Sequence, residues 1–354
     1  MNYRSLYWDD VEVGQDLPAI TYELSLLRLV AFVRATGVYD YIHFDRDYAQ
    51  SVGTRDAFAA TPHVAGLFSR LLTDWSGPEA EIKSMNFSMR AQSCAGDVLT
   101  ITGKVGNKYR SEAGEYLVDI VDMNIAHPLA PQAAVAQATL ALPSREGGAV
   151  KLAAAPECPA AIESHPEMPD FARALIGKGK DVTLRTRPLS ADELHLWCEC
   201  LEDWNPLYWD EAYARDSRHG SLVAPPLGLF YGAGSSTAIG VGYHKPGENV
   251  PAAVKSGLVG MELLQSLRQD FMAANAPISL PEFPEVVISD SRIDYYRPLR
   301  PGDSVRTVQR MVDCGPKKKT RLGEGYFLTW LNSDYNQHDE LLKTVKYTMF
   351  CYHT

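Results

Sequence analysis

The chain has 354 residues, of which 45% are hydrophobic, and a formal net charge of −10 at pH 7. This length suits two domains of ordinary size. An acidic chain without a concentrated face of Lys and Arg is not typical of a nucleic-acid-binding protein, so we expect no such partner. No run approaches the roughly 18 apolar residues of a membrane span, and the N-terminus, MNYRSLYWDD, carries acids where a signal peptide has an apolar core. We therefore expect a cytoplasmic protein with no membrane partner.

The first half predicts helices and then strands. Residues 25–36 have apolar positions at helical spacing and lead to Gly37, a helix stop. After Pro62, residues 64–75 form a second, strongly apolar helical stretch, which we expect to be a buried central helix. Strand-like patterns follow, separated by Gly-containing turns, over residues 83–91, 97–107, 115–127 and 132–143.

The second half repeats this order. Residues 146–182, rich in Ala, Pro and Gly, predict a linker between a first unit, 1–145, and a second unit, 183–354. The elements expected after it are a helix at 190–201, a loop at 202–210, an apolar segment from Pro225 through Gly232, and strands near 285–297, 303–312, 325–334 and 342–352.

Two pairs of matching phrases identify the chain as a tandem duplication. YDYIHFDRDYA (39–49) matches WNPLYWDEAYA (204–214) at a separation of 165, and residues 85–105 match 291–311 at a separation of 206. The second copy therefore carries an insertion of about 41 residues, most of it expected within 233–290. A connector of this length often covers a functional site, here a pocket for a bulky acyl group if the resemblance described below holds.

The two copies differ where proton chemistry is expected. His43, which can transfer protons near neutral pH, is replaced by Tyr208 in the second copy. Just upstream the difference is reversed, because Asp203 of the second copy matches Val38 of the first. The six cysteines form no C-x-x-C pair and lie near no His cluster, so we expect reduced thiols and no metal site.

These residues carry a resemblance to a known family. The loops 37–45 and 202–210, each placed before a central apolar segment, and the Pro-x-x-x-Gly-Asp run at 298–303 resemble the MaoC-like, or R-specific enoyl-CoA hydratase, branch of the hot-dog fold. The resemblance implies the α+β class and a tandem (double) hot-dog fold, in which each unit is an antiparallel sheet wrapped around a central helix.

The family's reaction is the reversible addition of water to a 2-enoyl-CoA, or elimination from a 3-hydroxyacyl-CoA, in fatty acid metabolism. It implies coenzyme A as part of the substrate and no separate cofactor. His43 is the acid and base that the resemblance implies, because the pKa of His lies near neutral pH. Backbone N–H groups at the start of the central helix would stabilise the enolate. The matching positions are Gly66, expected in the first turn of that helix, with Val64, Ala65 and His63 beside it.

The first unit departs from the family at Val38, where the family has its acid. Three interpretations stay open. Asp40 has taken over as the partner of His43, or Asp203 reaches across from the second unit, or the site is inactive and the chain is a binding subunit.

The second unit departs at two other columns. Glu202 replaces the family glycine and Tyr208 replaces the histidine, so we expect both the tight turn and the proton shuttle to be lost. Asp203, Asn205 and Tyr208 would then form a degenerate site that holds acyl chain and coenzyme A.

We therefore expect a hydratase or dehydratase of acyl thioesters, assembled as a homodimer or hetero-oligomer of double hot dogs. The alternative is a non-catalytic acyl-CoA-binding subunit of a hetero-oligomeric hydratase. A hot-dog thioesterase is third, because hydrolysis in that class needs a carboxylate on the central helix, and this helix offers Asp74 only near its end.

Overall fold

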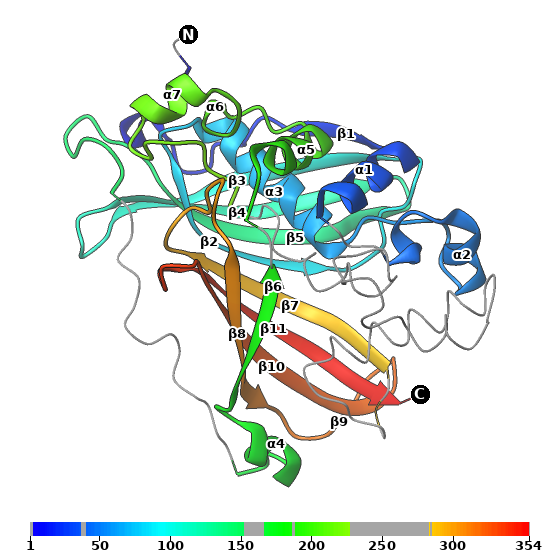
Figure 1. Ribbon diagram of the computed structural model, residues 1–354. Coiled ribbons are helices and arrows are strands. Elements are labelled where there is room, and N and C mark those ends of the chain that lie inside the picture. The colour runs from blue at the N-terminus through cyan, green and yellow to red at the C-terminus, as the bar shows by residue number, and fades with distance from the viewer. Residues whose placement is uncertain are drawn as a thin grey trace.

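The computed structural model of the protein describes residues 3–36, 40–151, 166–185, 188–226, 283 and 285–353. Its strands form one antiparallel sheet that runs through both units (Figure 1). In the first unit the strands are β1 (Ile20–Leu24), β2 (Glu81–Met89), β3 (Asp97–Arg110), β4 (Tyr116–His127) and β5 (Ala130–Ala141). Those of the second are β6 (Gly179–Arg185), β7 (Glu285–Tyr295), β8 (Val305–Cys314), β9 (Lys318–Lys319), β10 (Glu324–Tyr335) and β11 (Leu341–His353).

The strand order shows the duplication directly. It runs β1-β3-β4-β5-β2 in the first unit and continues as β7-β11-β10-β8-β6 in the second, with β9 paired to β10. The central pair, β2 and β7, joins Ser84 to Asp294 and Asn86 to Arg292. At a separation of 206, Arg292 is the counterpart of Asn86 itself, so a pseudo-twofold axis passes through this pair. Two halves of one sheet with matching strand order, related in this way, confirm the double hot-dog fold.

The helices of the first unit lie on one side of its sheet. They are α1 (Leu26–Thr36), α2 (Arg46–Ser51) and α3 (Thr61–Ser76), with short 3-10 turns η1 (Trp8–Asp10) and η2 (Tyr41–His43). α3 is the expected central helix and is buried over most of its length, because its sequence is apolar on nearly every face. It begins with Pro62 in its first turn and ends at Gly77, whose φ of 78° suits glycine.

The described helices of the second unit are α4 (Asp170–Leu175), α5 (Ala191–Leu201), α6 (Pro206–Trp209) and α7 (Glu211–Asp216). Helix α5 starts at a capping box, in which Ser190 and Glu193 satisfy each other's backbone N–H groups. It packs against α1 of the first unit, where the rings of Phe32 and Trp197 lie 5.3 Å apart. The two units therefore share a helical layer as well as a sheet.

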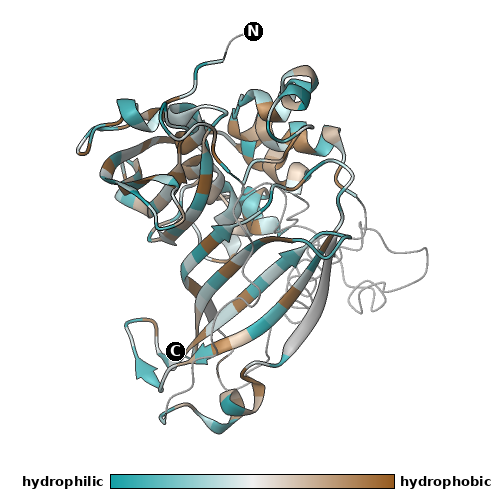
Figure 2. Cartoon of the chain, turned by 90° about the vertical axis from the view of Figure 1, so that its left-hand side faces the viewer, coloured by the Kyte–Doolittle hydropathy of each residue, from teal (hydrophilic) through white to brown (hydrophobic). Residues whose placement is uncertain are grey.

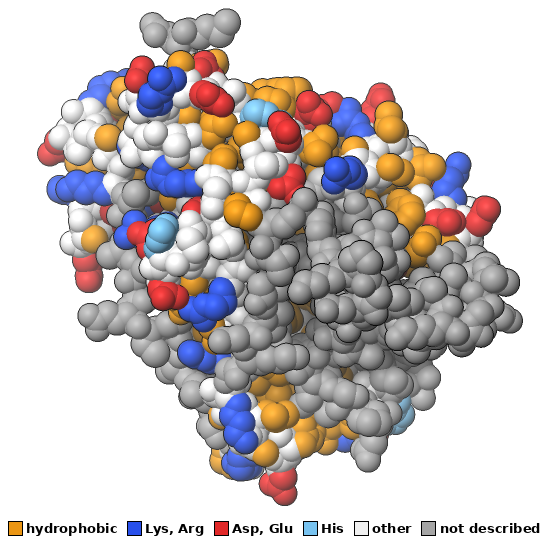
Figure 3. All heavy atoms as spheres, in the orientation of Figure 1, with side chains coloured by type: hydrophobic (Ala, Val, Ile, Leu, Met, Phe, Trp, Pro, Cys, Tyr) orange, Lys and Arg blue, Asp and Glu red, His pale blue; other side chains and the backbone are white. Residues whose placement is uncertain are grey.

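The strands alternate between hydrophobic and hydrophilic residues along their length (Figure 2). This alternation places one side chain in two against the helices. Acidic and basic side chains are interspersed on the described part of the face in Figure 3, as expected of a chain with no single-sign surface.

One expectation needs correction, and two strands were not predicted. The segment expected to be a linker contains α4 and the start of β6, so the structure of the second unit begins before residue 183. The strands β1 and β6 were not predicted, because five to seven residues next to a helix give little pattern to detect. The apolar segment from residue 227 and nearly all of the insertion within 233–290 lie outside the described residues.

Candidate functional site

The two matching loops fold in the same way. In each, a side-chain oxygen at the start accepts a hydrogen bond from the backbone N–H two residues on. In each, an aspartate caps the following short helix, and a carbonyl of the loop accepts from a backbone N–H 16 residues further along the chain. The corresponding bonds are Ile42 N to Asp40 Oδ1 and Leu207 N to Asn205 Oδ1, Tyr48 N to Asp45 Oδ1 and Tyr213 N to Asp210 Oδ1, and Phe58 N to Ile42 O and Val223 N to Leu207 O.

His43 is held by a backbone carbonyl. Its Nδ1 lies 2.9 Å from the carbonyl oxygen of Phe58, and its ring lies edge-on to the Phe58 ring at 5.1 Å. Because a carbonyl oxygen only accepts, Nδ1 carries the proton of the neutral imidazole and Nε2 carries the lone pair. The ring is half-buried. With the proton on Nδ1, it is in the tautomer that a general base acting through Nε2 needs.

Asp40 caps the start of its loop, as Asn205 does at the matching position of the second loop. Its Oδ1 accepts from Ile42 N at 3.3 Å, which makes it the N-cap of η2. The orientation of the His43 ring is accounted for by Phe58. Gly37, Val38 and Tyr39 lie outside the described residues.

His63 belongs to a buried chain of hydrogen bonds that links the two units. The Tyr22 hydroxyl donates to the Cys200 carbonyl at 2.7 Å, so it accepts from His63 Nε2 at 3.0 Å. The His63 ring stacks on Phe32 at 4.4 Å. Burial, with smaller contributions from His43 and Arg28, lowers the pKa of His63 to about 3, so the ring is neutral. Its Nδ1 has no hydrogen-bond partner among the described residues.

The expected oxyanion glycine lies deeper in the helix than predicted. Gly66 is the sixth residue of α3, in its second turn, where a backbone N–H is already bonded within the helix. A Cβ at this position would lie 2.6 Å from Leu201 of α5, so Gly66 allows the two units to approach. Val64 and Ala65 are buried beside it. The sequence comparison placed the helix start too late because Thr61 and Pro62 precede the apolar run.

Asp203 does cross to the first unit, but not to His43. It is fully buried, its Oδ2 accepts from the Thr73 hydroxyl at 3.2 Å, and its Oδ1 accepts from Asn205 N. Thr73 is ten residues beyond His63 on α3, which is roughly 15 Å along the helix. Burial, followed by the nearby Asp74, raises the pKa of Asp203 to about 7.

The tight turn of the second loop is retained, contrary to expectation. Glu202 adopts the left-handed conformation, with φ 57° and ψ 36°, that the family glycine would occupy. Non-glycine residues rarely do so, and the cost is of the order of 1 kcal/mol. Glu202 forms ion pairs with Arg28 and Arg70 of the first unit, and these contacts hold the side chain in place.

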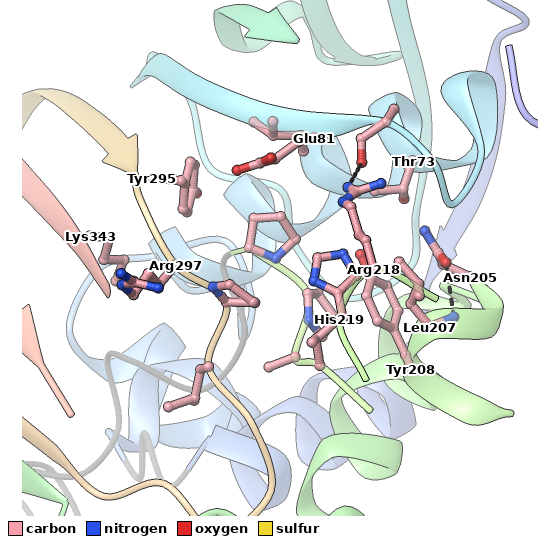
Figure 4. Close-up of a pocket in the computed structure, with 18 of the residues that line it drawn as sticks. Thr73, Glu81, Asn205, Leu207, Tyr208, Arg218, His219, Tyr295, Arg297 and Lys343 are labelled. Carbon is pink, nitrogen blue, oxygen red and sulfur yellow. Dashed lines mark hydrogen bonds between the residues drawn. The ribbon is translucent and has the colours of Figure 1, made fainter. Parts of the chain in front are cut away.

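A pocket adjoins the second loop and lies between the units (Figure 4). Asn205 and Tyr208 line it from the loop, and Thr73 lines it from the end of α3. Tyr208 is buried, and burial raises the pKa of its phenol well above its ordinary value, so it acts only as a hydrogen-bonding group near neutral pH. Of the three residues expected in the degenerate site, Asn205 and Tyr208 therefore line this pocket. Asp203 is not among the lining residues, and it accepts hydrogen bonds from Thr73 and Asn205.

Several site groups carried no sequence signal. The carbonyl of Phe58 and the hydroxyls of Tyr22 and Thr73 act through contacts that only folding creates. Among the described residues no group of His, Cys, Asp and Glu side chains is arranged to hold a metal ion. Within the same residues no helix is long and apolar enough to cross a membrane. The described cysteines are free and buried.

Comparison with known proteins identifies hydratases and dehydratases as relatives. Residues 176–249 match the family model described as FAS1-like, dehydratase domain region. The chain is 29% identical over 163 residues to the "Probable enoyl-CoA hydratase alpha subunit" of Thermomonospora curvata, covering 46% of this chain and 44% of that protein. It therefore spans less than half of that relative's length.

A second relative is matched over most of its length. The chain is 34% identical over 93 residues to the 3-oxo-4,17-pregnadiene-20-carboxyl-CoA hydratase beta subunit of Mycobacterium tuberculosis, covering 26% of this chain and 72% of that subunit.

Solved structures agree on the fold. A MaoC domain dehydratase of Chloroflexus aurantiacus superposes with a TM-score of 0.62 at 12% identity, covering 99% of this chain and 98% of that one. A Mycobacterium tuberculosis protein described as having a double hotdog fold gives 0.58 at 15% identity, with 98% of each chain covered. With the matching loops, the duplicated sheet and the beta-subunit match, the chain belongs to the MaoC-like hydratase and dehydratase family.

Proposed function

We propose that the protein hydrates a 2-enoyl-CoA, or dehydrates the corresponding 3-hydroxyacyl-CoA, with His43 as the acid and base. The observation that carries this proposal is the hydrogen bond from His43 Nδ1 to the Phe58 carbonyl, which leaves the lone pair on Nε2. The names of the hydratase relatives support the substrate class.

In the proposed reaction, His43 Nε2 takes a proton from water as its oxygen attacks Cβ of the enoyl thioester. The electron pair of the double bond moves to give an enolate, and the His43 imidazolium then donates the proton on Nε2 to Cα, which returns His43 to its neutral form. The carbonyl of Phe58 stabilises the imidazolium through the Nδ1–H bond, the role that a carboxylate usually fills. The chemistry uses protein groups and water, with coenzyme A as part of the substrate.

His43→Ala tests this assignment. We expect turnover to fall by roughly 10²–10⁴-fold, the usual effect of removing a general acid–base group, with unchanged thermal unfolding. The measurement is the absorbance loss of the conjugated thioester with a panel of trans-2-enoyl-CoAs.

The matched control is Asp40→Asn. An asparagine keeps the cap on Ile42 N, as Asn205 does on Leu207 N, so turnover should stay within about tenfold of the parent. A loss as large as that of His43→Ala would make Asp40 the true partner of His43. Full activity of His43→Ala would exclude His43 itself.

A binding role in a hetero-oligomer is the second candidate. It is favoured by two observations, the valine at the acid column and the relatives named as alpha and beta subunits. In that case the purified chain would bind acyl-CoA but hydrate it only after a subunit with a complete acid and histidine pair is added.

A further inference from the structure

One ring nitrogen of His63 has no partner among the described residues. His63 lies in the first turn of α3 and is 0% exposed. Its Nε2 is bonded to the Tyr22 hydroxyl, whereas its Nδ1 is buried and makes no hydrogen bond within the described chain. Buried polar atoms in proteins nearly always have partners, so this nitrogen indicates a small polar group, either a bound water or part of a ligand.

The Tyr22 hydroxyl determines which nitrogen of His63 carries the proton. The hydroxyl donates its one proton to the Cys200 carbonyl at 2.7 Å, because a carbonyl oxygen only accepts. It therefore accepts from His63 Nε2, and the lone pair of the ring is on Nδ1. Phe32 stacks on the ring at 4.4 Å and holds its plane. A carbonyl of the second unit thus sets the tautomer of a histidine in the first.

His63 lies near His43. The His43 ring is bonded to the carbonyl of Phe58, which is five residues before His63 in the segment that enters α3. After burial, the largest contribution to the lowered pKa of His63 comes from His43, ahead of Arg28. Arg28 itself is close, because its guanidinium lies 4.4 Å from the centre of the Tyr22 ring. Electrostatic effects weaken with distance, so the two histidines are neighbours.

The proposed hydration needs two acceptors for the attacking water. A water molecule has two protons, and His43 Nε2 accepts only one of them. The second acceptor fixes the direction of the oxygen lone pair toward Cβ, and such orientation is a large part of catalysis. At the column where the family has its acid, Val38 has no acceptor in its side chain, and Asp40 caps Ile42 N. Among the described groups near His43, the Nδ1 of His63 is a buried acceptor without another partner.

We propose that His63 is a second catalytic residue, whose Nδ1 accepts a hydrogen bond from the attacking water while His43 Nε2 takes the other proton. No proton is transferred to His63. Burial lowers its pKa to about 3, so the proton goes to the half-buried His43, which later donates it to Cα. Tyr22 is then a positioning residue that acts through the tautomer of His63. This role rests on the proposed hydration and names the group that orients its water.

Two substitutions of His63 separate the acceptor from the packing. His63→Phe keeps a flat ring against Phe32 but has no acceptor, whereas His63→Asn carries an oxygen two bonds from Cβ, where histidine has Nδ1. Both lose the bond to Tyr22. We expect kcat of His63→Phe to fall roughly 10²-fold with little change in KM, the usual cost of misplacing a reacting group by about 1 Å. We expect kcat of His63→Asn to stay within about tenfold of the parent, because its oxygen still accepts from water.

His195→Phe is the matched control. The His195 ring stacks on Trp209 at 4.5 Å, and its Nε2 donates to the Tyr208 carbonyl, so the same change removes a stacked histidine with one hydrogen bond. His195 lies in α5 of the second unit, and we expect hydratase activity as in the parent. Thermal unfolding of every variant is measured alongside kcat, which separates lost folding from lost chemistry.

The tautomer of His63 is measured without any activity. Nitrogen-15 NMR of the histidine rings in the full chain distinguishes a protonated from an unprotonated ring nitrogen, and His63→Asn identifies the His63 signals. We expect Nδ1 of His63 to be unprotonated from about pH 6 to about pH 8. In Tyr22→Phe we expect the proton on both nitrogens, and kcat to fall by roughly two- to tenfold as the wrong tautomer becomes populated.

Four outcomes count against this role. Parent kcat in His63→Phe, together with an inactive His43→Ala, would overturn the role of His63 and leave the proposed function standing. Equal losses in His63→Asn and His63→Phe would assign the effect to the bond with Tyr22 instead of water. A proton on Nδ1 in the parent would exclude the acceptor, and that measurement needs no variant. A parent that hydrates no enoyl-CoA would overturn the proposed function and this role together.

Discussion

Each of the two matching loops has kept one residue of the family's acid and histidine pair. His43 is present without an acid five residues before it, and Asp203 is present without a histidine five residues after it. A backbone carbonyl orients His43, whereas Asp203 bonds Thr73 at the far end of α3. The acid in the second unit has therefore become a buried structural group, and its titration should be visible in stability.

Asp203→Asn should change stability in a pH-dependent way. The folded pKa of Asp203, about 7, is above the unfolded value of about 3.9, so the folded protein holds a proton that the unfolded chain releases. The charged carboxylate thus lowers the free energy of unfolding progressively from about pH 4 to pH 7. Removing it should raise that free energy at pH 8 by about 4 kcal/mol, because the pKa differs by roughly 3 units at about 1.36 kcal/mol each, and hardly at pH 4.

Urea unfolding of parent and variant at the two pH values measures this difference. Thr73 can still donate to the asparagine oxygen, and the loss of the bond from Asn205 N, which an amide NH₂ cannot accept, is the same at both pH values. An equal effect at both pH values would mean that Asp203 is not protonated in the folded state near neutral pH.

At the scale of elements, the contact between α3 and α5 depends on a missing side chain. Gly66 lets Leu201 and Trp197 pack directly on α3, and the same helix pair carries the left-handed turn at Glu202. The family glycine at 202 has been replaced while the backbone conformation was kept. Position 66 is thus explained by packing between units.

Gly66→Ala should lower the free energy of unfolding by about 1 kcal/mol. The added methyl group would overlap Leu201, and such overpacking costs roughly 1–3 kcal/mol, partly offset by the higher helix propensity of alanine. A double-mutant cycle with Leu201→Ala measures the coupling, since the smaller side chain should remove the overlap. Additive effects of the two substitutions would show that the contact is not the cause.

At the scale of the whole molecule, the sheet is continuous only because β2 meets β7 across the pseudo-twofold axis. Asn86 pairs with its own counterpart, Arg292, at the centre of this contact. Without the second unit, the edge of β2 that β7 covers would be open, and the β2 of a second copy could pair with it. An uncovered strand edge is a template for pairing with another chain.

Residues 1–151 expressed alone should therefore form a dimer through β2. The expected register pairs Asn86 with Asn86 of the second copy, by analogy with Asn86 and Arg292. Sedimentation velocity measures the mass, and Asn86→Pro should weaken the dimer because proline lacks the backbone N–H that a paired strand needs. A stable monomer at high concentration would show that β7 offers contacts that β2 cannot.

The sequence by itself determined the duplication, the order of the long elements and the loop that holds His43. Helices and strands have local periods that a sequence shows directly. Two copies of one fold also keep the same turn between matching strands, as Gly96-Asp97 and Gly302-Asp303 do at a separation of 206. Short strands beside helices gave no such signal.

Only the tertiary structure decided which groups act on those residues. The carbonyl that orients His43, the hydroxyl that meets Asp203 and the leucine that explains Gly66 come from segments brought close by folding. Strand register alone shows that the buried pair Asp334 and Lys343 occupies the place of Ile125 and Ala134 in the first unit. Burial and partnership depend on contacts between distant residues, and a one-dimensional pattern does not contain them.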